Sequence, residues 1–131
     1  LLDRIDIHVN VPPVEVAALV RKGGGESSAV VRARVLRARE RQKARAKELG
    51  TRSYLNATLP SAVLEKVATL DDESKKLIES AVNRLGLSAR AFNKVVRVAR
   101  TVADLDGEEL VRVGHIAEGI QGRILDRNER R

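Results

Sequence analysis

The sequence predicts a mostly α-helical protein, a helical bundle with one long basic helix that follows a single strand. Hydrophobic residues make up 43% of the 131 residues but aromatic residues only 2%, so a core must consist of Val, Leu, Ile and Ala. Arg, Lys and Glu are abundant, which favours helices over a β-sandwich. Apolar residues also recur every three or four positions through most of the chain, as on one face of a helix.

The first residues have a different pattern. Residues 1–11 alternate apolar and polar side chains, and this period of two predicts a half-buried strand. A lone strand needs pairing partners, so we expect it to be left over from a larger domain. Residues 13–20 (PVEVAALV) predict a short helix, and Gly23–Gly25 predicts a flexible break after it.

A long basic helix is predicted next. Ser27 or Ser28 is a suitable N-cap, and the helix should reach about Glu48, with Gly50 beyond its end. From Ser27 to Lys47 its net charge is +7, equal to that of the whole chain. A narrow apolar seam is expected at Val31, Val35, Ala38, Gln42 and Ala46. One flank of the seam holds Arg32, Arg39, Lys43 and Lys47. The other flank holds Arg34, Arg37, Arg41 and Arg45.

From residue 55 onward the pattern is that of a helical bundle. Each predicted helix has a start signal, a periodic apolar face or a glycine stop. The predicted helices are 60–67, a second from Asp71 or Asp72 to Gly86, a third from Ser88 to Gly107, and a fourth from about Val113 to Leu125.

Several classes of function are excluded or disfavoured. Cysteine is absent, which excludes disulfides, iron–sulfur clusters and cysteine nucleophiles. The two histidines are far apart, so we expect no metal site: His115 should be structural, and His8 should lie on the polar face of the strand. The sequence lacks the GxxxxGK[ST] phosphate loop. It also lacks an apolar stretch long enough for a membrane helix, and we expect a cytoplasmic protein that makes no membrane contact.

Two arginines have unusual positions. Arg4 begins the predicted strand, and Arg90 falls in the first turn of the third bundle helix. A cation at a helix N-terminus opposes the helix dipole, so Arg90 is better explained if an anion binds beside it.

Five segments carry a resemblance to a known family: LLDRIDIHVNV, GESSAVVRARVLRARERQ, LNATL, LGLSARAFNKVVRVARTVADLDG and HIAEGIQGRILDR. In this order they resemble the C-terminal region of magnesium-chelatase-like AAA+ ATPases, and most closely the ComM family of bacterial competence proteins. The resemblance implies that residues 1–25 are the tail of an AAA+ core. Residues 26–54 would be the basic helix and its connection, and residues 55–131 the AAA+ helical lid.

The resemblance also implies roles for the two arginines. Arg4 matches the arginine finger, which reaches the nucleotide of a neighbouring subunit in trans. Arg90 matches the sensor-2 arginine, which contacts nucleotide phosphate from the lid of its own subunit. The parent protein would be a hexameric ATPase that uses ATP and Mg²⁺. This part alone lacks the Walker motifs, so we expect it neither to bind a cofactor nor to hydrolyse ATP.

The function implied for the parent is DNA remodelling by branch migration. A basic helix without aromatic residues suits contact with DNA that does not depend on sequence. The candidate DNA-binding residues are Arg32, Arg34, Arg37, Arg39, Arg41, Lys43 and Arg45. The alternatives are the motor subunit of a metal chelatase, with protein and porphyrin partners, and a stand-alone basic helical DNA-binding module. The helix could also pack on an acidic neighbouring subunit.

Overall fold

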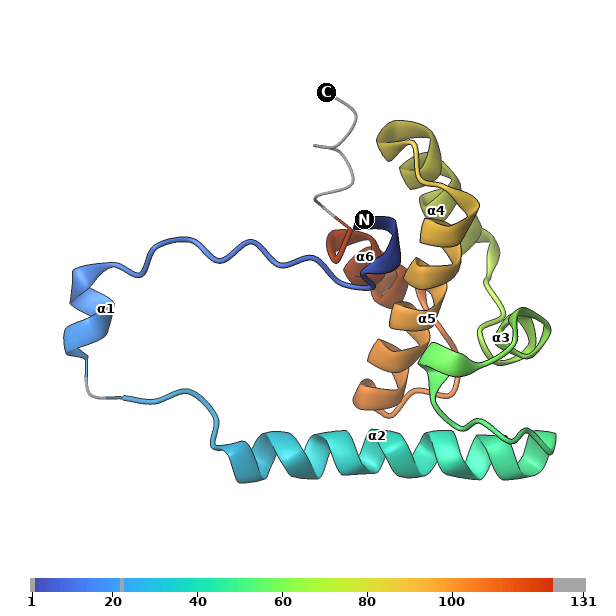
Figure 1. Ribbon diagram of the computed structural model, residues 1–131, viewed down its shortest axis with the longest axis horizontal. Helices are drawn as coiled ribbons and strands as arrows, with labels where there is room; N and C mark the ends of the chain where they lie inside the picture. The colour runs from blue at the N-terminus through green and yellow to red at the C-terminus, as the bar shows by residue number, and fades with distance from the viewer. Residues whose placement is uncertain (1, 22, 124–131) are drawn as a thin grey trace.

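The computed structural model describes residues 2–21 and 23–123, and all regular structure within these ranges is helical (Figure 1). This confirms the predicted fold class. There are two short 3₁₀ turns, η1 (Leu2–Arg4) and η2 (Asn56–Thr58). The α-helices are α1 (Val16–Val20), α2 (Ser28–Leu49), α3 (Ser61–Val67), α4 (Asp72–Leu85), α5 (Ala89–Asp106) and α6 (Val113–Gln121).

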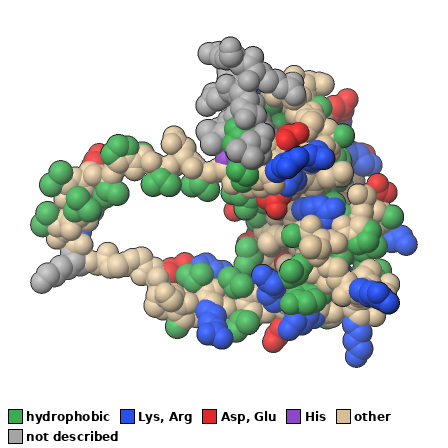
Figure 2. Space-filling model, viewed as in Figure 1, with side chains coloured by type: hydrophobic (Ala, Val, Ile, Leu, Met, Phe, Trp, Pro, Cys, Tyr) green, Lys and Arg blue, Asp and Glu red, His purple; other side chains and the backbone are tan. Residues whose placement is uncertain are grey.

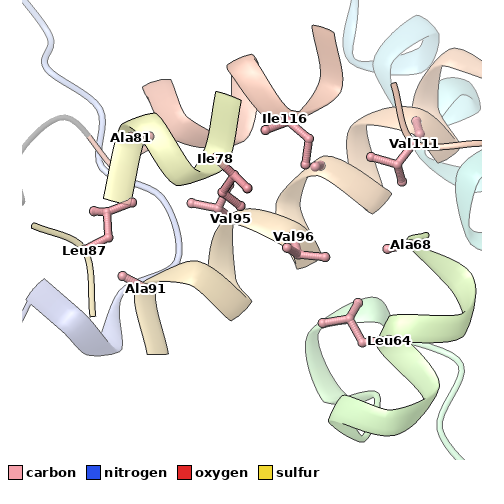
Figure 3. Packing of buried hydrophobic residues seen from close by; sticks show 12 residues of the cluster. Leu64, Ala68, Ile78, Ala81, Leu87, Ala91, Val95, Val96, Val111 and Ile116 are labelled. Carbon is pink, nitrogen blue, oxygen red and sulfur yellow. The ribbon is translucent and has the colours of Figure 1, made fainter. Parts of the chain in front are cut away.

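Helices α3 to α6 form the bundle, with α5 at its centre (Figure 1). The predicted apolar stripe of α5 is buried at Val95, Val96, Ala99 and Ala103. It packs against Ile78 of α4 and Ile116 of α6 (Figure 3). The small aliphatic side chains that replace aromatic residues in this core allow the helices to approach one another closely.

Gly119 marks the closest approach of α6 to α5. A Cβ atom at this position would lie 2.8 Å from the carbonyl oxygen of Val95. Only glycine fits there without a backbone shift, so Gly119 sets the spacing of the two helices.

The predicted start and stop signals of the helices are confirmed. Ser27, Asp71 and Ser88 each accept a hydrogen bond from the backbone N–H three residues further on. Three helices end at glycines in the left-handed conformation, with φ of 65°, 61° and 79° at Gly50, Gly86 and Gly107. Helix α6 ends at Gln121, before the expected end at Leu125, a residue that lies outside the described ranges.

Helix α2 contacts the bundle along only part of its length. Ala38, Gln42 and Ala46 of the predicted seam are buried, whereas Val31 and Val35 are exposed. Figure 1 shows the reason: the first turns of α2 extend beyond the bundle. The seam prediction is therefore correct for the C-terminal half of α2 and wrong for the N-terminal half.

The strand predicted over residues 1–11 is not formed within residues 2–11. The chain makes the turn η1 and then continues without regular structure. The described residues contain no other strand that could pair with it. Helix α1 is shorter than the predicted helix at 13–20. No described helix has the length and hydropathy required to cross a membrane.

The chain then forms an arm, residues 9–21 and 23–27, which leaves the bundle and returns to it at α2 (Figure 1). Its large apolar residues are all exposed, and Figure 2 shows hydrophobic side chains along it. They are Val9, Val11, Val14, Val16, Leu19 and Val20.

Candidate phosphate-binding cleft and basic helix

The segment that carries Arg4 is fastened to the start of α5. The hydroxyl of Ser88, the N-cap of α5, donates to the Asp3 carboxylate at 3.3 Å. One turn into α5, Lys94 Nζ donates to the Arg4 carbonyl oxygen at 3.2 Å and forms an ion pair with Asp6. Arg4 itself is exposed.

The other side of the same segment is held by the end of α6. The buried guanidinium of Arg123 donates to the carbonyl oxygens of Leu2 and Ile5. His8 N–H donates to the Gly122 carbonyl oxygen at 2.6 Å, and the His8 ring lies 3.2 Å from the Leu2 carbonyl oxygen. His8 is thus buried, and its predicted place on an exposed polar face is wrong because the chain turns back on itself here instead of forming a strand.

Beside this segment lies an open basic cleft of about 430 Å³. Arg90, Lys94 and Arg97 recur at helical spacing on one face of α5 and line the cleft. Arg90 is exposed and makes no hydrogen bond or ion pair within the described residues. Its guanidinium has planar, paired donors of the kind that bind phosphate oxygens. The remaining lining residues are Asp6, Ala57 and Asn93.

An apolar groove of about 390 Å³ continues from the cleft along α5. Ile7, Val98, Val102 and Leu105 line it, and it shares Asp6, Ala57 and Arg97 with the basic cleft. The two together form one continuous surface with a basic end and an apolar end.

The charged residues that line the cleft are three cations and a single acid. Its one acid, Asp6, is paired with Lys94. In the described ranges no group of three or more His, Cys, Asp or Glu residues is arranged to hold a metal ion. His115 is structural, as predicted: its Nδ1 accepts from the Arg112 backbone N–H at 2.9 Å, and its Nε2 lies 3.1 Å from Asp106.

The two flanks of α2 have different surroundings. One flank, here the inner flank, consists of Arg34, Arg37, Arg41 and Arg45. Three of these four residues contact other residues of the chain. Arg34 pairs with Glu26, the Arg41 guanidinium lies against Gly107 at the end of α5, and Arg45 pairs with the Asp104 carboxylate.

The other flank, here the outer flank, consists of Arg32, Arg39, Lys43 and Lys47. Lys43 lies 5.5 Å from the centre of the Tyr54 ring, the distance of a cation–π contact. Arg32, Arg39 and Lys47 are exposed and make no ion pair with any described residue, and the same holds for Arg37 of the inner flank. Figure 2 shows Lys and Arg side chains projecting where α2 lies.

A buried ion cluster joins α2 to α5. The Asp104 carboxylate, 0% exposed, accepts from Arg45 and lies 3.0 Å from Arg100 Nη2. Arg100 also donates to three backbone carbonyl oxygens, at 2.7–3.0 Å. Burial lowers the pKa of Arg100, while the neighbouring Asp104 acts in the opposite direction.

Asp104 and Asn56 were not among the predicted functional residues. Asp104 is reached by Arg45 from α2 and by the side-chain amide of Asn56 from η2, and no spacing in the sequence reveals these two contacts. One signal was available: Arg100 and Asp104 are a charged pair four residues apart, placed within the apolar stripe of α5.

The chain is similar to known proteins along most of its length. Residues 25–123 match the family described as magnesium chelatase, subunit ChlI C-terminal. The chain is 39% identical over 127 residues to competence protein ComM of Haemophilus influenzae and 36% identical over 127 residues to the uncharacterized protein YifB of Escherichia coli. It is 30% identical over 123 residues to the uncharacterized protein Rv2897c of Mycobacterium tuberculosis. These matches cover 94–96% of this chain but only 24% of each relative.

Proposed function

The chain belongs to the magnesium chelatase subunit ChlI C-terminal family, and from this premise we propose that it is the nucleotide-sensing lid of a longer, hexameric AAA+ ATPase that remodels DNA. One observation carries the nucleotide part of the proposal. Arg90 has no hydrogen-bond or ion-pair partner among the described residues, and it lies in a cleft with two further cations, Lys94 and Arg97, beside the segment that holds Arg4. ATP and Mg²⁺ would be bound by the longer protein.

The attachment of the Arg4 segment to α5 helps to decide whether Arg4 and Arg90 contact the same nucleotide or two different ones. In a ring, each subunit contacts one neighbour on one side and a second neighbour on the other. A single cleft on a subunit therefore faces only one nucleotide site. Contacts of Asp3 with Ser88 and of Lys94 with the Arg4 carbonyl oxygen fasten the Arg4 segment to the first turns of α5, the helix that carries Arg90. We therefore propose that both arginines act in trans on the same neighbouring nucleotide, instead of Arg90 acting within its own subunit.

The test is ATP turnover by the full-length protein. Arg90→Ala should lower turnover about a hundredfold or more, because it removes a charge-assisted donor to phosphate. Arg84→Ala, an exposed arginine at the end of α4, is the matched control and should leave turnover unchanged. Normal turnover by Arg90→Ala would refute the sensor role.

Mixed rings test the assignment in trans. Subunits with Arg90→Ala are mixed with subunits whose phosphate-loop lysine is replaced, so that neither kind hydrolyses ATP alone. If Arg90 acts in trans, the second kind supplies its arginine to the intact nucleotide sites of the first kind, and turnover recovers. If both variants assemble but the mixture stays inactive, Arg90 acts within its own subunit.

The outer flank of α2 supports the DNA part of the proposal. Its cations are exposed, and phosphate oxygens are a suitable partner for such a row. About three to four phosphate contacts per subunit should give a slope near −3 for log affinity against log salt concentration. Arg32→Glu with Arg39→Glu should weaken DNA binding more than the control Arg34→Glu with Arg41→Glu, because the control residues face Glu26 and the end of α5.

The family description favours one alternative, the motor subunit of a metal chelatase. In that case the partner of α2 would be an acidic protein subunit. ATP turnover that DNA leaves unchanged, together with equal DNA affinity of the two double variants, would favour this alternative.

A further inference from the structure

Asn56 of η2 has partners on two sides of the molecule. It is 2% exposed, and its side-chain amide donates to Asp104 at 2.9 Å and to Thr101 at 3.1 Å. Its side-chain oxygen lies 3.4 Å from Arg45 Nη1, and its backbone carbonyl oxygen accepts from Arg97 Nη1 at 2.7 Å. A single buried residue thus contacts one arginine of the basic helix and one arginine of the basic cleft.

Arg97 is the link on the cleft side. It lines both the basic cleft and the apolar groove, and it uses one terminal nitrogen to bind Asn56. A guanidinium has five N–H donors, and the others make no hydrogen bond within the described part of the chain. Arg97 can therefore bind an anion in the cleft while it still holds Asn56.

Arg45 is the link on the side of α2. Its side chain is 20% exposed, and both terminal nitrogens contact the Asp104 carboxylate. Moving α2 away would leave this buried carboxylate with one fewer cation, which is costly in a buried setting. The position of α2 is thus tied to the pair Asp104 and Asn56.

We propose that the contacts Arg97–Asn56–Arg45 couple phosphate occupancy of the cleft to the DNA affinity of α2. This inference rests on the proposed function and adds its regulation: nucleotide bound at the cleft changes how α2 meets DNA. The coupling is reciprocal, so DNA bound at α2 changes nucleotide affinity by the same factor.

The experiment measures the affinity of the full-length protein for a fluorescently labelled DNA duplex of random sequence, with and without AMP-PNP. In the wild type the nucleotide should change the dissociation constant by about 5–150-fold. Arg45→Met cuts the link on the side of α2, and Asp104 keeps Arg100 and Asn56 as partners. In this variant the ratio of the two dissociation constants, with and without nucleotide, should fall to about twofold or less.

Two further variants make the result decisive. Arg52→Met, an exposed arginine after the end of α2, is the matched control and should keep the wild-type ratio. Arg45→Lys keeps one cationic donor and should give an intermediate ratio. If Arg45→Met loses helix content by circular dichroism, Arg45→Lys decides in its place.

The outcomes separate this inference from the proposed function. A wild-type ratio in a folded Arg45 variant overturns the coupling alone, and so does a wild type that binds DNA equally with and without nucleotide. A wild type that neither binds DNA nor hydrolyses ATP overturns the proposed function, and the coupling with it.

Discussion

The arm and the bundle use the same kinds of apolar residue in opposite environments. Val16 of α1 is 75% exposed, whereas Ile116 of α6 is 0% exposed. Helix α1 has five residues and no buried face, while α5 has eighteen residues and contacts α2, α3 and α6. An apolar residue is buried when its helix is long enough and has neighbours. We therefore expect substitutions in the bundle to lower stability and substitutions in the arm to leave it unchanged.

The charges show the same contrast, and they provide the largest expected effect. Asp104→Ala removes a buried carboxylate and leaves Arg100, which is 1% exposed, as a buried cation. The free energy of unfolding of the 131-residue chain should fall by about 3–5 kcal/mol in urea titrations. Glu26→Ala breaks the exposed pair with Arg34 and should cost only about 0–1 kcal/mol. Equal losses in the two variants would refute the contrast.

The apolar residues give the next largest effect. Ile116→Ala opens a cavity between α5 and α6 and should cost about 2–5 kcal/mol. Val16→Ala in the arm should change stability by no more than about 0.5 kcal/mol. Both are measured by urea unfolding of the same chain. A comparable loss in Val16→Ala would mean that the arm packs on the bundle.

The smallest effect concerns pH and helix α4. The backbone N–H of Ser74 donates to Asp71 and, as the main cause, holds the pKa of this carboxyl below its ordinary value. A carboxyl with a lowered folded pKa stabilises the fold above its unfolded pKa, and this stabilisation is lost as pH falls through the folded value. Asp71→Asn keeps the cap without the charge.

Stability should therefore fall slightly more steeply in the wild type than in Asp71→Asn, between about pH 5 and pH 3. Urea midpoints measured across this range test the difference. Parallel curves would show that the charge of Asp71 adds nothing to the cap.

The contrast between the arm and the bundle also explains which features could be predicted from the sequence. The bundle helices follow from local signals, such as Ser88 before α5 and Gly107 after it, and from the apolar stripe between them. The strand over 1–11 was predicted from an equally clear local pattern, but a strand depends on partners that are not among the described residues. The seam of α2 fails for the same reason at Val31 and Val35, where no neighbouring helix covers it.

The candidate site was predictable in part. Arg90 stood out because its position in the helix is electrostatically unfavourable. Arg4 stood out by its place at the start of the predicted strand and then through the resemblance. The rest of the cleft depends on how residues 2–8 fold back onto α5 and α6. This folding determines how Lys94 and Arg97 contribute to the cleft and where the Arg4 backbone lies beside it. The different surroundings of the two flanks of α2 depend on Asp104. This residue approaches Arg45 only after α2 and α5 have packed together.

The contact between Lys43 and Tyr54 has a practical consequence. Tyr54 is the only tyrosine, and the sequence has no tryptophan, so the tyrosine emission of the unlabelled chain comes from one ring beside α2. Displacement of α2 would uncover this ring and increase its quenching by acrylamide. The chain thus carries its own optical reporter for the position of its basic helix.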